Sequence, residues 1–206
     1  MSDADRLVAE LRPYVADEHV LAAIRRVPRE AFVPGELRDQ AYENVALAIG
    51  CGQTISQPLV VARMTELLAV GPDDHVLDVG TGSGYHAAVL ARLAARVVSI
   101  ERHAALSESA RAALDAAGAR GVTLIVGDGS WGYPEAAPYD AINVAARGPR
   151  GVAIRLAEQL ADGGRLVIPS GGAERLVLIR RRGARLEQER HDRVRFVPLV
   201  TGPGAG

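Results

Sequence analysis

The stretch Val76-Leu77-Asp78-Val79-Gly80-Thr81-Gly82-Ser83-Gly84 joins an apolar run to three alternating glycines, and a helical pattern follows at once over 84–95. Glycine carries no Cβ atom, so it lets the backbone turn tightly and approach a ligand closely. The start of the following helix directs backbone N–H groups towards that ligand. The stretch therefore predicts a strand, a glycine loop and a helix that together bind a nucleotide-type cofactor.

A carboxylate follows where such a site needs one. The next apolar run ends in Glu101, 21 positions after Gly80, and an acid there can accept hydrogen bonds from both hydroxyls of a ribose. A dinucleotide enzyme has glycine or alanine at the sixth position of the motif, but this chain has Tyr85 there and its third glycine is Gly84. The difference favours S-adenosyl-L-methionine over NAD.

Two further acids complete the set expected of a methyltransferase with this cofactor. Asp78 precedes the glycine loop, and Asp128 follows the third predicted strand, where an acid near the adenine belongs. Ordinary turns with solvated acids are the alternative, but three elements agree in order and spacing. His86 follows the glycine loop and could contact the cofactor, but we expect a solvated residue at the start of the helix. The cofactor candidates from these segments are Asp78, Gly80, Thr81, Gly82, Ser83, Gly84, Glu101, Arg102, Asp128 and Gly129.

Composition and charge limit the class of protein. A chain of 206 residues suits one α/β domain with a buried core. Because 24 Lys and Arg balance 25 Asp and Glu, we expect no nucleic-acid or membrane partner. The chain has no leader-like start, and its single cysteine, Cys51, excludes an internal disulfide. We expect a cytoplasmic protein, a monomer by default, with no metal site.

The order of predicted elements indicates an α/β fold. Strands alternate with helices along most of the chain, which favours a doubly wound, mainly parallel, Rossmann-like sheet with helices on both faces. The segments 175–182 and 186–200 predict an antiparallel hairpin at the C-terminal edge of the sheet. The other predicted strands are 75–79, 96–101, 122–126, 139–144 and 165–169, and the helices are 84–95, 104–117 and about 151–161.

The residues before the sheet predict a helical flank. Asp17 is a candidate N-cap, Val27-Pro28 a stop signal, and 58–70 an amphipathic helix that ends before Gly71-Pro72. We interpret 1–206 as a single methyltransferase domain in three parts. These are an N-terminal helical flank with the substrate and cofactor loop (1–57), a Rossmann-like core (58–200) and a loose tail (201–206).

A polar segment before that helix resembles a known family. Gly52-Gln53-Thr54-Ile55-Ser56-Gln57-Pro58, together with 62–68, resembles the N-terminal signature of the protein-L-isoaspartate O-methyltransferases. Nearly the whole chain takes part in the resemblance. The further matching segments are 27–33, 41–47, 127–132 and 194–200.

The resemblance implies methyl transfer from S-adenosyl-L-methionine to the α-carboxylate of L-isoaspartyl residues in damaged proteins and peptides, which starts repair through a succinimide. It implies Ser56 as the catalytic serine, with Thr54 and Ile55 beside it as cofactor-binding residues. Capping of the helix that begins near Pro58 is an additional or sole alternative role for Ser56. The implied substrate-binding residues are Ser56, Phe196, Val197, Pro198 and Leu199.

Departures from the family pattern leave two alternatives open. Typical members have a proline-containing turn into the next helix, whereas this chain has Arg147-Gly148-Pro149-Arg150 and no proline where Val152 stands. Asn143 places a polar side chain in an expected buried strand. One alternative is a related O-methyltransferase that acts on an aspartate of a dedicated peptide. The other is a non-catalytic methyltransferase-like binding module. The glycine loop with Glu101, Asp128 and Ser56 argues against the second.

Overall fold

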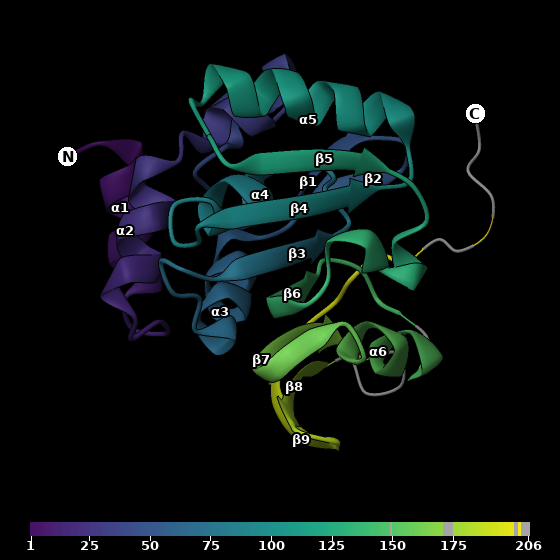
Figure 1. Cartoon of the computed structure of the whole chain (residues 1–206). Helices are drawn as coiled ribbons and strands as arrows, with labels where there is room; N and C mark the ends of the chain where they lie inside the picture. The colour runs from purple at the N-terminus through teal and green to yellow at the C-terminus, as the bar shows by residue number, and fades with distance from the viewer. Residues whose placement is uncertain (149, 171–174, 200–201, 203–206) are drawn as a thin grey trace.

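The central sheet has seven strands (Figure 1). They are β3 (His75–Val79), β4 (Arg96–Glu101), β5 (Val122–Val126), β6 (Tyr139–Val144), β7 (Leu160–Pro169), β8 (Arg175–Arg182) and β9 (Arg185–Arg193). Their order is β5-β4-β3-β6-β7-β8-β9, with the first five parallel and β8 and β9 antiparallel to their neighbours. The structure is a computed structural model that describes residues 1–148, 150–170, 175–199 and 202.

Side chains of the strands alternate between two buried faces. Val76 and Leu77 are neighbours in the chain but belong to different hydrophobic clusters, and so do Val97 and Val98. All of β3 is buried, as expected for a parallel strand that is covered on both faces. The predicted α/β fold, a mainly parallel Rossmann-like sheet with an antiparallel C-terminal edge, is confirmed.

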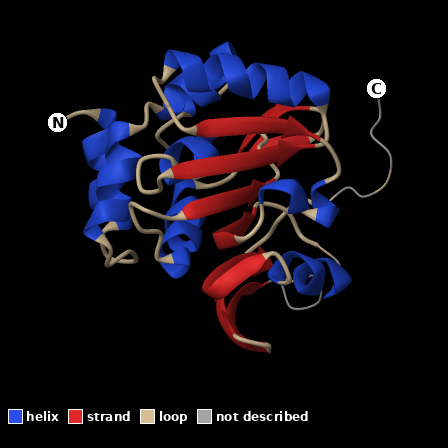
Figure 2. Cartoon of the chain, viewed as in Figure 1, coloured by secondary structure: helices blue, strands red, loops and turns tan. Residues whose placement is uncertain are grey.

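Helices cover both faces of the sheet (Figure 2). The helices α3 (Pro58–Leu68) and α4 (Tyr85–Leu90) supply Met64 and Leu90 to the cluster with Val76. The helix α6 (Arg150–Ala157) supplies Leu156 to the cluster with Leu77. The helix α5 (Ala104–Ala116) packs against α4, β4 and β5.

Two of these helices are shorter than predicted. After Leu90 the chain continues in tighter turns, in which Leu93 N–H donates to Leu90 C=O at 2.9 Å, so α4 does not reach residue 95. The helix α6 ends at Ala157 because Leu160 already pairs with Tyr139 at the start of β7. At the end of α6, sheet pairing, which local sequence does not reveal, therefore includes Leu160, which helical periodicity assigned to the helix.

The N-terminal helices form the expected flank. They are α1 (Asp3–Leu11) and α2 (Glu18–Arg26), followed by the single turns η1 (Arg29–Phe32) and η2 (Gly35–Gln40). Asp17 caps α2, because its Oδ1 accepts hydrogen bonds from His19 N–H at 2.8 Å and Val20 N–H at 3.3 Å. The helix α2 packs on α1, α3 and α4. No helix in the described part of the chain is long and apolar enough to cross a membrane.

A small hairpin that the sequence did not predict precedes α3. Its strands are β1 (Leu47–Gly50) and β2 (Gln53–Ile55). Both residues of the connecting turn have left-handed backbone, with φ of +49° at Cys51 and +68° at Gly52. Positive φ at both central residues is the signature of a type I′ turn, which joins antiparallel strands. The second strand of this hairpin, β2, lies within the polar segment 52–58 and ends directly before Ser56.

Replacing Cys51 by asparagine is expected to stabilise the protein. A left-handed conformation is costly for most side chains, whereas asparagine adopts it more readily. We expect a gain of about 0.5–1 kcal/mol in the free energy of unfolding, or roughly 1–4 °C in Tm. Thermal unfolding of Cys51→Asn, with Cys51→Ala as the control, measures the effect. Equal melting temperatures for the two variants would contradict it.

The C-terminal hairpin ends earlier than predicted. The strand expected at 186–200 stops at Arg193, and the following segment leaves the sheet to pair with the loop after β6, through a bridge between Arg147 and Pro198. Proline has no N–H with which to continue a ladder, so Pro198 suits such an edge position. Val200 and the predicted loose tail lie outside the described residues, except for Gly202.

Candidate active site

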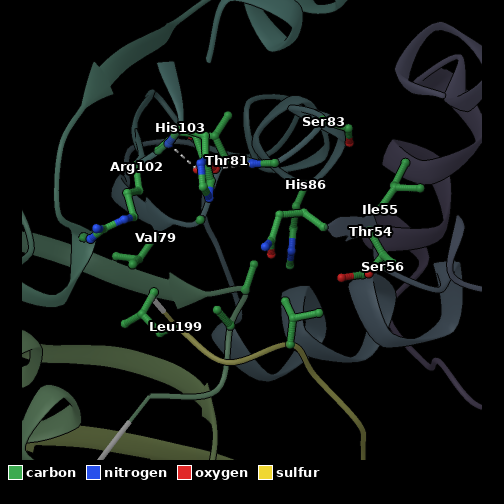
Figure 3. A pocket seen from close by; sticks show the side chains of 18 of the residues that line it. Thr54, Ile55, Ser56, Val79, Thr81, Ser83, His86, Arg102, His103 and Leu199 are labelled. Atoms are coloured by element: carbon green, nitrogen blue, oxygen red, sulfur yellow. Dashed lines mark hydrogen bonds between the residues drawn. The ribbon is translucent and has the colours of Figure 1, made fainter. Parts of the chain in front are cut away.

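A cavity opens at the carboxyl ends of β3, β4 and β6 (Figure 3). The chain runs from β3 outward through β4 and β5 and then returns to β6 on the other side of β3. Ligands of open α/β sheets bind where the strand order reverses in this way. Ser56 lies at one end of the cavity in Figure 3 and Arg102 at the other, with His86 between them.

The glycine loop forms one wall of the cavity through its backbone. Gly80 and Gly82 have φ of +95° and +53°, which residues with side chains rarely adopt. Gly80 N–H donates to Ile100 C=O at 2.9 Å, and Gly82 N–H donates to the Glu101 carboxylate at 2.8 Å. The loop is therefore held against the end of β4.

The Glu101 carboxylate organises the backbone on both sides of it. Its Oε2 accepts from Gly82 N–H at 2.8 Å and its Oε1 from His103 N–H at 2.9 Å. The side chain is buried and lines the cavity. Each carboxylate oxygen can accept more than one hydrogen bond. Glu101 therefore keeps the capacity to bind two neighbouring hydroxyls.

Asp78 lies beneath the cavity and does not line it. It is fully buried, and its oxygens accept hydrogen bonds from Ser99 Oγ and Asn143 Nδ2, both at 2.7 Å. The Thr81 hydroxyl reaches the same Ser99 Oγ at 2.6 Å. Burial raises the pKa of Asp78 to about 6, although the bonds from Asn143 and Ser99 oppose the rise. This carboxylate supports the glycine loop from below.

The expectation that His86 is solvated is wrong: it is buried and lines the cavity. Its Nδ1 lies 3.1 Å from Asn143 Nδ2, and its Nε2 lies 3.1 Å from Thr65 Oγ1. The Thr65 hydroxyl donates to Val61 C=O at 2.8 Å, so Nε2 is the nitrogen that donates and Nδ1 the one that accepts. Asn143 thereby links His86 to Asp78. Asn143, the polar residue in the buried strand β6, therefore connects β6 to β3 through Asp78 and to α4 through His86.

Acidification is expected to destabilise the protein through His86. Burial lowers the pKa of His86 to about 3, so between that value and about 6.5 the unfolded chain binds a proton that the folded one does not. The contribution of the neutral His86 to the free energy of unfolding is therefore fully present above about pH 6.5 and is lost as the pH falls towards 3. Asp78 acts in the opposite sense between about 3.8 and 6, because its pKa is raised.

The His86→Gln variant isolates the histidine contribution. Between pH 7 and pH 5 the wild type should lose about 2 kcal/mol of unfolding free energy relative to the variant. The opposing effect of Asp78 is common to both proteins and cancels in the difference. Chemical denaturation at several pH values measures it. A difference that does not change with pH would show that His86 titrates normally in the folded state.

Asp128 is engaged by backbone groups and does not line the cavity. It caps the turn η3 (Gly129–Trp131), accepting from Ser130 N–H at 2.9 Å, and it accepts from Gly202 N–H at 2.8 Å. Partial burial raises the pKa of Asp128, but the backbone hydrogen bonds from Gly202 and Ser130 lower it by more, so the pKa lies below its usual value. The Arg102 side chain donates to the Gly202 carbonyl. Gly202 thus lies between two predicted cofactor residues.

The Ser56 side chain is available for a ligand. Helix α3 begins at Pro58 with Gln57 at its N-cap, so the alternative role of Ser56 as the N-cap is wrong. Within the described part of the chain, the Ser56 hydroxyl forms no hydrogen bond. The residue is half-buried, and its hydroxyl points into the cavity (Figure 3).

A buried arginine fixes the backbone of Ser56 from behind. Arg29 is fully buried and donates to Ser56 C=O at 2.8 Å and to Ala41 C=O at 2.8 Å. Its guanidinium stacks on the Tyr85 ring, 4.6 Å from the ring centre, and Tyr85 lines the cavity. Among the described residues no carboxylate oxygen lies within 4.0 Å of Arg29. The backbone carbonyl of Ser56 is therefore held by the Arg29 guanidinium, whose positive charge is stabilised by backbone carbonyl groups and not by a carboxylate of the described residues.

The C-terminal segment closes the cavity beside Ser56. Arg147 N–H donates to Val197 C=O and Leu199 N–H donates to Arg147 C=O, both at 2.9 Å. Val197, Pro198 and Leu199 line the cavity, whereas Phe196 lines an adjoining groove that shares Ser56 with it. Three of the four predicted substrate residues of this segment therefore meet Ser56 in the cavity itself.

Comparison with known proteins assigns the chain to a family. The family model described as protein-L-isoaspartate(D-aspartate) O-methyltransferase (PCMT) matches residues 2–204. The chain belongs to this family. It is an S-adenosyl-L-methionine-dependent O-methyltransferase of L-isoaspartyl residues.

Relatives of this family are similar along almost the whole chain. A protein-L-isoaspartate O-methyltransferase of Halorhodospira halophila is 54% identical over 202 residues, covering 96% of this chain and 91% of its own. One of Methanoregula boonei is 53% identical over 188 residues, covering 90% and 86%. A solved protein-L-isoaspartate O-methyltransferase aligns with a TM-score of 0.87 at 28% identity, covering 98% of this chain and 67% of its own.

A further solved structure shares the fold. It is a candidate protein-L-isoaspartate O-methyltransferase from Plasmodium falciparum in complex with S-adenosyl-L-homocysteine. It aligns with a TM-score of 0.84 at 22% identity, covering 97% of this chain and 99% of its own.

Most of the predicted cofactor residues of this family member meet at the cavity. Those that line it are Thr54, Ile55, Gly80, Thr81, Gly82, Ser83, Glu101, Arg102 and Gly129. Asp78, Gly84 and Asp128 do not line it. Gly84 serves packing, because it begins α4 with φ of +88° and a Cβ atom there would lie 3.2 Å from Ala110 Cβ.

Several lining residues were not among the site residues predicted from the sequence. They are Gln53, Val61, Val79, Tyr85, His86, Ile100, His103, Ala145 and Ala146. Most are neighbours of predicted residues on the same loops, so a wider window around each motif would have included them. Arg29 is different, because it lies 27 positions before Ser56 and only the tertiary fold brings the two together.

Proposed function

We propose that Ser56 orients the α-carboxylate of the isoaspartyl substrate for attack on the methyl group of S-adenosyl-L-methionine. The observation that carries this proposal is the hydroxyl of Ser56, which faces the cavity without a partner among the described residues while Arg29 holds its carbonyl at 2.8 Å. A fixed backbone with a free side chain suits a group that must position a substrate.

The chain's own residues fit the cofactor at the opposite end of the cavity. We infer that Glu101 binds the ribose hydroxyls, because its carboxylate lines the cavity and is already oriented by Gly82 N–H and His103 N–H. When bound, S-adenosyl-L-methionine supplies an electrophilic methyl group on a sulfonium. Gly129 lines the same cavity, and packing requires glycine there because a Cβ atom would lie 2.6 Å from Val79 Cγ1.

The reaction needs no general base. A carboxylate with an ordinary pKa near ~4 is already ionised at neutral pH, so no residue of the protein would have to remove a proton before methyl transfer. The sulfonium would supply the methyl group and leave as the neutral thioether. What remains for the protein is to align oxygen, carbon and sulfur and to exclude water, and orientation is worth roughly 7–11 kcal/mol. The neutral His86 and the engaged Asp78 agree with this requirement, since neither is placed to accept a substrate proton.

The backbone beside Ser56 suits an extended peptide. In an extended chain, the backbone N–H and C=O groups of successive residues point to opposite sides. Val197 and Leu199 form hydrogen bonds with Arg147 on one side of the segment. The N–H and C=O of Phe196 therefore point to the other side. Within the described residues, those two groups have no hydrogen-bond partner. We propose that an isoaspartyl peptide pairs with Phe196 while its α-carboxylate reaches Ser56.

The proposal is tested with two synthetic peptides that carry L-isoaspartate or L-aspartate at one position. Methyl incorporation from labelled S-adenosyl-L-methionine should occur with the isoaspartyl peptide and be at least about 100-fold lower with the aspartyl one, because only the former presents a free α-carboxylate. Cofactor binding is measured in parallel by calorimetry. Activity on neither peptide, with the cofactor bound, would refute repair and favour a dedicated peptide or a non-catalytic module.

A further inference from the structure

A positively charged groove leads away from Ser56 along the C-terminal segment. It adjoins the cavity and shares Thr54, Ser56, Ala145 and Val197 with it. Its other side chains include Arg193 and Arg195, and none of the described residues that line it is acidic. The groove therefore carries positive charge, although apolar side chains such as Val60 and Phe196 also line it.

The two arginines are free to bind a ligand. Both are exposed, and neither forms an ion pair or side-chain hydrogen bond with another described residue. The nearest acid in the sequence, Asp192, is already paired, because its carboxylate accepts from Arg63 Nε at 2.9 Å. Arg175, which faces Arg193 in the β8–β9 ladder, adds a further positive charge.

The position of these charges relates them to the substrate. Arg195 directly precedes Phe196, whose backbone we assign to pairing with the peptide, and Phe196 and Val197 line the same groove. A peptide whose isoaspartyl carboxylate reaches Ser56 would place its flanking residues along Arg193 and Arg195. Main-chain pairing supplies affinity for any sequence, whereas charges along the groove discriminate between side chains.

We propose that this groove selects isoaspartyl sites with acidic flanking residues. The proposal rests on the proposed function, since it requires that the peptide reach Ser56. Arg193 and Arg195 bind Asp or Glu side chains beside the isoaspartyl residue, and they repel Lys and Arg. Because the arginines are exposed, the selection is electrostatic and weakens as salt rises.

The experiment compares two isoaspartyl peptides that differ only in having Glu or Lys at the flanking positions. At low salt, the KM of the Glu peptide should be about 3- to 10-fold below that of the Lys peptide, with similar kcat. The ratio should approach one as ionic strength increases. The charge-reversed variant Arg193→Glu/Arg195→Glu should invert the preference.

A matched control separates the groove from the net charge of the protein. Arg185 and Arg190 are exposed on the same hairpin but do not line the groove, so Arg185→Glu/Arg190→Glu changes the charge equally. It should keep the preference of the wild type. Equal KM values for the two peptides, or a preference that survives charge reversal at 193 and 195, would overturn the inference. Methylation of neither peptide would overturn the proposed function and the inference with it.

Discussion

Ser56→Ala is expected to lower kcat for the isoaspartyl peptide by about 10- to 100-fold and to change the Kd of S-adenosyl-L-methionine by less than about twofold. In the proposed mechanism the lost hydroxyl donates to a charged carboxylate, and such a hydrogen bond contributes about 1.5–3 kcal/mol. Cofactor binding should persist, because the Ser56 backbone stays held by Arg29 and the glycine loop is untouched. Turnover with a labelled cofactor gives kcat, and calorimetry gives Kd.

Ser109→Ala is the matched control for this substitution. Ser109 is exposed on α5 and donates only to Ala105 C=O, so its loss should leave both measurements unchanged. Loss of cofactor affinity in Ser56→Ala, with no separate decrease in kcat, would contradict the assignment of Ser56 to the substrate. An unchanged kcat would remove Ser56 from the reaction altogether.

Glu101→Ala is expected to weaken cofactor binding by about 100-fold or more. The substitution removes the carboxylate proposed for the ribose, and it also leaves Gly82 N–H and His103 N–H without their acceptor. Loss of hydrogen bonds to a charged group costs about 1.5–3 kcal/mol for each bond. Calorimetric titration with S-adenosyl-L-methionine measures the Kd, and kcat at saturating cofactor should fall less than the affinity does.

Two comparisons sharpen this result. Glu101→Gln keeps one acceptor oxygen and should bind the cofactor with intermediate affinity, whereas Glu108→Ala, an exposed acid on α5, should bind it normally. Glu101→Ala that binds the cofactor as tightly as the wild type would contradict the ribose assignment. Circular dichroism of each variant separates loss of binding from loss of fold.

The sequence predicted the central parallel strands β3 to β6 better than the ends of the elements around them, for a physical reason. The runs 75–79, 96–101, 122–126 and 139–144 coincide with β3, β4, β5 and β6, because each is a short apolar run bounded by polar residues or turns. The end of a helix depends on where the next element begins its own pairing. Helix α6 ends at Ala157, for example, because Leu160 pairs with Tyr139 and begins β7. The hairpin of β1 and β2 was missed because its turn at Cys51 lacks the usual residues.

The residues of the cavity also divide into those that local motifs predicted and those that depend on long-range contacts. The glycine loop, Glu101, Ser56 and the end segment were predicted, because these features are local motifs with a definite spacing. The hydrogen bonds of Asn143 and His86 were not, since they join β6, α4 and α3 across the interior. Buried polar groups must find partners, but the sequence does not say which ones.

Periodicity and short loops encode local backbone conformation, so the amino-acid sequence was enough to predict the fold class, the family and the motifs that build the cavity. The support for those motifs comes from the tertiary structure. It places Arg29 behind Ser56, Asp78 beneath the glycine loop, and along the groove two arginines that pair with no other described side chain. These contacts join residues far apart in the chain, and their geometry follows from packing, which has no local signature.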